Sequence, residues 1–318
     1  MAEDEKPFGF IRHPPSSILN EMKRSKLYLS GIQLMSQSAI CFSIMALCVK
    51  YLSASLSPYQ IAFFRSFFGL LVILPFIWRK KVSLWGKERF TLTVRGLCGF
   101  GALILHFYTI TKLELGLAIM LYYTAPIFTV IFSVFFLKER PSPFLCLLIF
   151  SSFVGVVLLN TRSGAIWNPA VWLALIASIF SAFAYLSIRT IRQRESPYTV
   201  IFYFTLISTV GSLFFLKDWK WPDLGSWGLI AGVVVSSFYG QVWMTTALRR
   251  APAYLVTPFS YLHPVLSFVY GWLLWGDTVT GVMASGIFLI VGSGSLISYF
   301  ETKREKKLHA SLSSESCL

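Results

Sequence analysis

An arginine inside an apolar stretch is the residue whose position most restricts its chemistry. Arg65 lies within a predicted span over 58–78, about 10 Å along the helix axis at 1.5 Å per residue. A cation at that depth costs several kcal/mol unless it faces protein or water. Arg65 is therefore a candidate ligand for the carboxylate or phosphate of a bound molecule. The alternative is a structural arginine bonded to backbone carbonyls or helix ends.

Two Tyr-x-x-Pro motifs lie in apolar stretches, Tyr123 with Pro126 and Tyr261 with Pro264. A proline inside a helix frees the carbonyl four residues back and kinks the axis. The tyrosine three residues earlier lies on the same helix face. The two motifs are thus candidates to line a central cavity and provide flexure, or else they are packing kinks with ordinary contact tyrosines.

Two histidines, His106 and His263, also fall within predicted spans. Each is a candidate to bond substrate or carry a proton, and the alternative is a satisfied bond between helices. No Cys or carboxylate lies near them at ligand spacing, so we expect no metal site and no cofactor. Trp243 is a further candidate to line the same cavity. Three other residues could line it as well: Tyr108, Tyr239 and Gln241. For all four, packing within the protein or against lipid is the alternative.

Two acids, Glu139 and Asp277, close predicted spans on opposite faces. A carboxylate at a helix C-terminus opposes the helix dipole and needs a partner. They are therefore candidates for gate salt bridges, one on each face, or solvated loop carboxylates.

The elements that must position these residues are membrane-spanning helices. The 318-residue chain is 55% hydrophobic and only 13% charged, with a mean hydropathy of +0.66, whereas a soluble domain carries about 25% charged residues. A helix needs about 20 apolar residues to cross the hydrocarbon. The sequence predicts an all-α membrane protein without a separate soluble domain. Its ten predicted spans are 27–50, 58–78, 91–111, 115–137, 143–160, 169–188, 198–216, 226–248, 253–275 and 279–300.

The distribution of Lys and Arg predicts the orientation. With the N-terminus inside, 21 of the 28 basic residues fall on the cytoplasmic side, 5 fall outside, and Arg65 and Arg95 fall within spans. This bias predicts an inner-membrane protein with a cytoplasmic N-terminal tail (1–26) and a basic, Ser-rich cytoplasmic tail (301–318). The net charge of +14 is thus explained by basic residues that flank the spans and contact the lipid bilayer. No nucleic-acid partner is therefore expected.

The two halves of the chain, 27–160 and 169–300, repeat each other. Ser-Pro-Tyr at 57–59 recurs at 196–198, and the Tyr-x-x-Pro motif and the acid that follows it recur at an offset of 138. Each half holds five predicted spans, and because five is odd, the second copy should be inverted relative to the first. Inverted repeats are typical of secondary transporters, whose halves rock around a site near the bilayer midplane.

The motifs resemble the drug/metabolite transporter superfamily, in particular its ten-span EamA-like members. The resemblance covers about residues 30–300 and rests on PYQIAFFR (58–65), the mid-span Pro126, KERP (138–141), and PFSYLHP (258–264) followed by WGD (275–277). AFFR together with P-F-x-Y-L is also similar to S-adenosylmethionine carriers of intracellular bacteria. The resemblance implies transport of a small organic metabolite by alternating access, with S-adenosylmethionine-like, amino-acid and nucleotide-like substrates all open.

Other function classes find less support in the sequence. No clustered catalytic groups are visible, so an enzyme is not expected, and no filter-like loop or ring of charge indicates a channel. A lipid or lipid-precursor flippase on the same fold is the alternative. No Asp or Glu lies in the middle of a predicted span, which favours exchange, facilitated transport, or proton handling by a histidine. Oligomeric state is not determined by the sequence.

Overall fold

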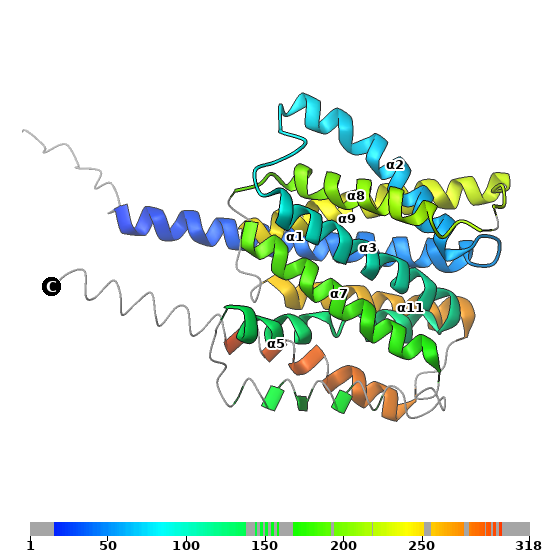
Figure 1. Cartoon of the computed structure of the whole chain (residues 1–318). Coiled ribbons are helices and arrows are strands. Elements are labelled where there is room, and N and C mark those ends of the chain that lie inside the picture. The colour runs from blue at the N-terminus through cyan, green and yellow to red at the C-terminus, as the bar shows by residue number, and fades with distance from the viewer. Residues whose placement is uncertain are drawn as a thin grey trace, which may run out of the picture.

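The computed structural model describes residues 16–137, 168–191, 194–217, 219–250, 256–276, 280–289 and 291–293, with single or paired residues between 144 and 158 and between 295 and 300. Throughout this part of the chain the regular structure is helical, and the helices run side by side in a bundle (Figure 1). The elements are α1 (Ser16–Leu52), α2 (Pro58–Arg79), α3 (Arg89–Lys112), α4 (Leu115–Tyr122), α5 (Ala125–Leu137), α7 (Pro169–Ile191), α8 (Pro197–Leu213), α9 (Leu224–Arg250), the 3₁₀ helix η2 (Thr257–Tyr261) and α11 (Leu262–Trp275).

The predicted helical class is confirmed, whereas the number of ten spans stays a prediction. In the described residues, five helices are long and apolar enough to cross a membrane: Leu29–Leu52, Pro58–Arg79, Arg89–Lys112, Pro169–Ile188 and Leu224–Arg250. Shorter apolar helices cover Leu115–Thr129, Pro197–Leu213 and Gly281–Ser293. The first helix begins at Ser16, inside the segment predicted as a polar tail.

The repeated Ser-Pro-Tyr motif is a helix start in both halves. Ser57 precedes α2, and its hydroxyl accepts the backbone N–H of Gln60 at 3.3 Å. Ser196 precedes α8 and accepts the N–H of Tyr198, also at 3.3 Å. Proline follows each serine, at the helix position where its missing N–H has no intrahelical partner anyway. The sequence repeat therefore preserves a local capping chemistry.

The repeated Tyr-x-x-Pro motif interrupts the helix instead of bending it. The span predicted over 115–137 is two helices, α4 and α5, and Pro126 is the second residue of α5. In the other half the chain runs as η2 up to Tyr261, and Pro264 lies in the first turn of α11. Proline is tolerated in a first turn because no intrahelical bond is lost there. Each motif therefore starts a new helix where a kink within one helix was predicted.

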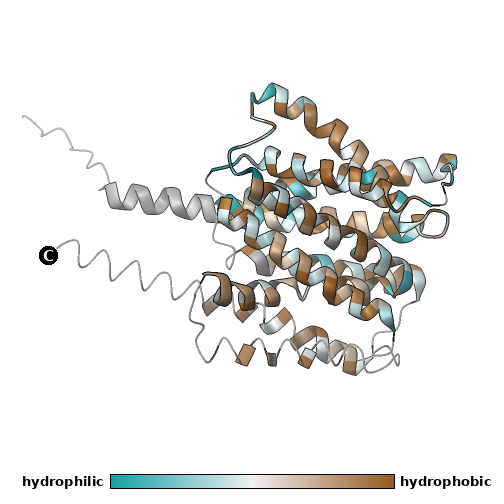
Figure 2. Ribbon diagram, viewed as in Figure 1, coloured by the Kyte–Doolittle hydropathy of each residue, from teal (hydrophilic) through white to brown (hydrophobic). Residues whose placement is uncertain are grey.

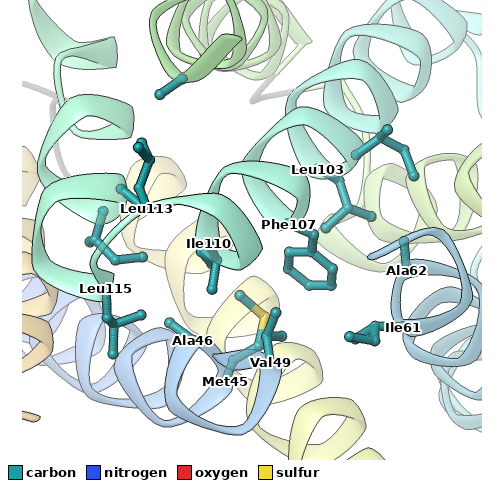
Figure 3. Packing of buried hydrophobic residues seen from close by; sticks show 14 of the residues in the cluster. Met45, Ala46, Val49, Ile61, Ala62, Leu103, Phe107, Ile110, Leu113 and Leu115 are labelled. Atoms are coloured by element: carbon teal, nitrogen blue, oxygen red, sulfur yellow. The ribbon is translucent and has the colours of Figure 1, made fainter. Parts of the chain in front are cut away.

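The interior is packed with small and medium apolar side chains. Figure 3 shows α1 contributing Met45, Ala46 and Val49 to a buried cluster. These side chains face Phe107 and Ile110 of α3. Many large apolar residues remain on the outside of the bundle, and Figure 2 shows hydrophobic colouring along its outer helices. The inside and the outside of the bundle are thus both apolar, as expected when the surrounding solvent is lipid.

Helices from the first half pack on helices from the second half. α1 lies along α9, and α3 lies along α7; α2 packs against α8, and α4 against α11. Close approach between α1 and α9 is marked by the Ser38 hydroxyl, which donates to the Gly240 carbonyl at 2.7 Å. The interface between the halves consequently runs through the centre of the bundle.

Candidate functional site

A cavity of about 70 Å³ lies at the interface between the two halves. It is lined by residues of α1, α2, α3, α4 and the turn after it, α7, α8, α9 and α11: Phe42, Met45, Arg65, Arg95, Gly99, Ala102, Leu103, His106, Tyr122, Tyr123, Ser181, Ala184, Tyr185, Phe204, Gln241, Met244 and His263. Pockets that hold small-molecule ligands are typically about 300–1,000 Å³. The cavity is thus too small for a typical metabolite as it stands.

Two buried arginines define the charge of the cavity. Arg65 of α2 and Arg95 of α3 are each only 3% exposed. Their guanidinium carbons lie 5.1 Å and 4.9 Å from the centroid of the same Phe204 ring, so they are no more than about 10 Å apart. Stacking on an aromatic face stabilises a guanidinium. Phe204 occupies the repeat position equivalent to Arg65, so the ring replaces a second cation there.

The arginine charges are not neutralised by carboxylates in the described part of the chain, where none lines the cavity. Among the residues that the structure describes, Arg65 Nε and Nη1 and Arg95 Nε have no hydrogen-bond partner. At an effective dielectric constant of about 20, two unit charges about 10 Å apart repel by about 1.7 kcal/mol. Holding two cations this close without a counter-charge is unfavourable, and an anion between them would relieve it.

Two histidines complete the polar lining. The His106 ring stacks on Tyr122, with centroids 4.0 Å apart, and Tyr122 Oη donates to Ser181 Oγ at 3.1 Å. His263 Nδ1 lies 3.0 Å from Tyr123 Oη. This second pair is a hydrogen bond between the two halves at the wall of the cavity.

Several polar atoms at the cavity have no partner within the described residues. They are His106 Nδ1, His263 Nε2 and Gln241 Oε1. A buried polar group without a hydrogen bond costs about 1–3 kcal/mol. Together with the arginine nitrogens they form a set of donors and acceptors that a bound molecule could satisfy. By contrast, the described residues hold no group of three His, Cys, Asp or Glu side chains suited to a metal ion.

The structure brings together four of the six predicted binding residues. Arg65, His106, Tyr123 and His263 line the cavity, as does Gln241. Tyr261 is not in the lining, but its ring lies 6.1 Å from that of Tyr123 and is buried.

The remaining candidates lie elsewhere. Trp243 packs on Tyr239, which is 45% exposed, and the Lys112 ammonium lies over the ring of Tyr108. None of these three aromatic residues is among those that line the cavity. The predicted gate residues Glu139 and Asp277 lie outside the described residues.

Arg95 is the charged cavity residue that sequence reasoning missed. It falls within a predicted span but only a few residues from its start, where an arginine is usually read as a flank at the membrane surface. The available signal was its presence in a span at all, as for Arg65. Only the packing of α3 against α8 places Arg95 over Phe204, beside Arg65.

Hydrogen bonds between the halves tie both ends of the bundle. At one end Glu195, which is 6% exposed, accepts the backbone N–H groups of Lys87 and Glu88 at 2.5 Å and 2.7 Å. At the other end Gln60 Nε2 donates to the Lys220 carbonyl at 2.9 Å. The cavity lies between these two sets of contacts.

A helical bundle with an apolar exterior and a charged cavity between two repeated halves is the architecture of a multi-pass membrane transporter. The sequence model of the EamA-like transporter family matches residues 29–161 and 168–299. The chain therefore belongs to the EamA-like transporter family, one match for each half. The predicted membership of the drug/metabolite transporter superfamily is confirmed.

Relatives with names are transporters and not enzymes. A pseudopaline exporter, CntI, of Pseudomonas aeruginosa is 31% identical over 268 residues, covering 83% of this chain and 94% of its own. An S-adenosylmethionine uptake transporter of Rickettsia prowazekii is 25% identical over 288 residues, covering 90% and 98%. A solved crystal structure shares the fold with a TM-score of 0.62 at 19% identity, covering 89% of this chain and 98% of that one. This protein is accordingly a transporter of small metabolites in general terms.

Proposed function

We propose that this protein is a secondary transporter that moves a small organic metabolite across the inner membrane by alternating access. The single observation that carries the proposal is the cavity between the halves. It combines buried, unneutralised arginines with unpartnered polar atoms of both halves, in a protein whose family transports metabolites. Such a set of polar groups is what binds and orients a small molecule in a concave site.

The packing of the helices supports a pseudo-twofold relation between the two halves, which an inverted repeat requires. The sequence offset pairs α1 with α7 and α3 with α9, so an exchange of halves converts the α1–α9 contact into the α7–α3 contact. The α2–α8 contact maps onto itself under the same exchange. A pseudo-twofold arrangement of this kind gives two conformations of similar energy that open to opposite sides.

The size of the cavity supports a conformational cycle. A volume of about 70 Å³ must grow before a metabolite can enter. Opening one end breaks the Glu195 contacts with the 80–88 loop, and opening the other breaks the contact of Gln60 with Lys220. Since both sets are hydrogen bonds between the halves, rocking the halves breaks one set while the other holds.

The charge of the cavity favours exchange as the mode of coupling. No carboxylate from the described residues lines it, so a bound proton or sodium ion would lack the usual acidic ligand. An empty cavity with two buried cations is also the least favourable state of the cycle. Return of the transporter with a second anionic molecule bound avoids that state.

Reconstitution tests the proposal directly. The purified full chain is placed in liposomes, and uptake of a labelled metabolite panel is measured with and without unlabelled substrate inside. We expect saturable uptake of at least one soluble metabolite, faster when substrate is preloaded. Liposomes that take up no member of the panel but flip fluorescent lipids between leaflets would replace the proposal with the flippase alternative.

A further inference from the structure

We infer that the cavity selects a small organic acid with two carboxylates and at least one N–H or O–H donor, bound between Arg65 and Arg95. This inference rests on the proposed function, because it assigns a substrate class to the same cavity. Three observations support it: the geometry of the two arginines, the absence of a counter-charge among the described residues, and the polar atoms around the arginines that have no partner there.

The two arginines form one site. Both guanidinium groups lie over the ring of Phe204 and both are buried. A guanidinium binds a carboxylate through two parallel N–H bonds. With the two carbons within about 10 Å of each other, two carboxylates joined by a short carbon chain can reach one arginine each.

A purely structural role leaves the arginine nitrogens unexplained. An arginine that ties helices together donates to backbone carbonyls or to carboxylates. Arg65 Nε and Nη1 and Arg95 Nε donate to neither within the described part of the chain, and all three atoms are buried. The contact with Phe204 stabilises part of each charge but occupies no N–H group in a hydrogen bond. The missing partners are acceptors, and the ligand supplies them.

The neutral polar atoms of the cavity add a second requirement for the ligand, a hydrogen-bond donor besides the two carboxylates. Gln241 lines the cavity, and its Oε1 atom is buried and accepts no hydrogen bond from any described residue. An ammonium or hydroxyl on the ligand would donate to it. His106 Nδ1 and His263 Nε2 also have no partner in the segments that the structure describes, and they can bond the same polar groups of the ligand. An amino diacid matches this combination, whereas a simple hydrocarbon or a lipid tail does not.

The same charges disfavour a cationic substrate. S-adenosylmethionine carries a sulfonium and an ammonium against one carboxylate, so its net charge is positive at neutral pH. Two buried cations repel such a molecule, and the low dielectric of the site strengthens the repulsion. This chain therefore should differ in substrate from the Rickettsia relative named for S-adenosylmethionine, although most of its length aligns with that protein.

Binding to the purified full chain tests the inference. The cavity is small, so the probes are the smallest members of each class: glutamate, succinate, alanine and S-adenosylmethionine. Isothermal titration at one salt concentration gives the dissociation constants. A charge-assisted contact contributes about tenfold to a hundredfold in affinity. We expect glutamate to bind at least about tenfold more tightly than alanine, which lacks the second carboxylate, and more tightly than succinate, which lacks the ammonium.

Variants separate ligand contact from folding. Arg65→Lys and Arg95→Lys keep the charge but lose the planar fork, so each should weaken glutamate binding by about tenfold while alanine binding changes less. Arg79→Gln is the matched control, since Arg79 belongs to α2 but is exposed. It should bind glutamate like the unmodified chain. Wild-type protein alone gives the comparison of the four probes, so the inference does not depend on any variant folding.

Two results would overturn the inference. One is alanine or S-adenosylmethionine binding as tightly as glutamate to the unmodified chain. The other is the absence of binding by both diacids. If liposomes nevertheless take up S-adenosylmethionine, the proposed transport function stands and only the substrate class is wrong. If they take up no soluble metabolite and flip lipids, the transport function itself is wrong.

Discussion

The contact of Glu195 with the loop between α2 and α3 provides a quantitative test of how the halves are held at one end. Glu195 is buried and follows α7, and one of its carboxylate oxygens accepts two backbone N–H groups just before α3, at 2.5 Å and 2.7 Å. The perturbation is Glu195→Gln, which keeps the shape and an acceptor but removes the charge. Nearby, Glu88 pairs with Arg194 at 2.7 Å through side chains that are 35% and 71% exposed. Glu88→Gln is thus the matched control.

The expected magnitudes follow from burial and charge. A hydrogen bond to a charged group contributes about 1.5–3 kcal/mol and a neutral one about 0.5–1.5. Removing the charge from two such bonds should lower the free energy of unfolding by about 2–3 kcal/mol. An exposed ion pair contributes at most about 1 kcal/mol. If 1 kcal/mol shifts the melting temperature by roughly 2 °C in a chain of this size, Glu195→Gln should lower it by about 4–6 °C, and Glu88→Gln by no more than about 2 °C.

The assay is thermal unfolding of the purified variants in one detergent, followed by tryptophan fluorescence. Uptake into liposomes is the second readout. Since Glu195 does not line the cavity, transport by Glu195→Gln should persist. Equal melting shifts for the two variants would refute the reasoning from buried charge. Complete loss of transport by a well-folded Glu195→Gln would show that the residue does more than hold the halves together.

Three further predictions concern orientation, coupling and the cavity wall. A reporter fused near Ser55 should report the outside, and a reporter fused to the C-terminus should report the cytoplasm, because most Lys and Arg residues fall on the side predicted to be cytoplasmic. A cytoplasmic signal near Ser55 would contradict this topology. Uptake should respond more to preloaded substrate than to a pH gradient, and acid-driven uptake that survives His106→Ala with His263→Ala would refute both arguments about protons. Tyr123→Phe should lower the free energy of unfolding by about 1–3 kcal/mol because it leaves His263 Nδ1 without its bond. The Tyr261 hydroxyl has no partner among the described residues, so Tyr261→Phe should change that free energy little in the same thermal assay.

The helices were largely predictable because their causes are local. Runs of about 20 apolar residues leave a chain in lipid no alternative but to satisfy its backbone hydrogen bonds within a helix. Ser57 and Ser196 cap two of these helices, and a serine followed by a proline is a signal for a helix start that is contained in the local sequence. The two Tyr-x-x-Pro motifs were recognised in the sequence, but the backbone structure that they form was not predicted. A proline in a first turn and a proline at a kink have the same sequence pattern, and the break before Pro126 depends on how α4 and α5 pack.

The sequence by itself determined that this protein is a helical membrane protein built from two repeated halves, that Arg65 lies deep in a span, and that the family is one of transporters. The tertiary structure alone decided which side chains meet. It placed Arg95 beside Arg65 over one aromatic ring, joined Tyr123 to His263 across the halves, and left Trp243 outside the cavity. The physical reason is that apolarity along a chain fixes where a helix forms, whereas the direction in which each side chain points depends on how that helix is rotated against neighbours far away in the sequence.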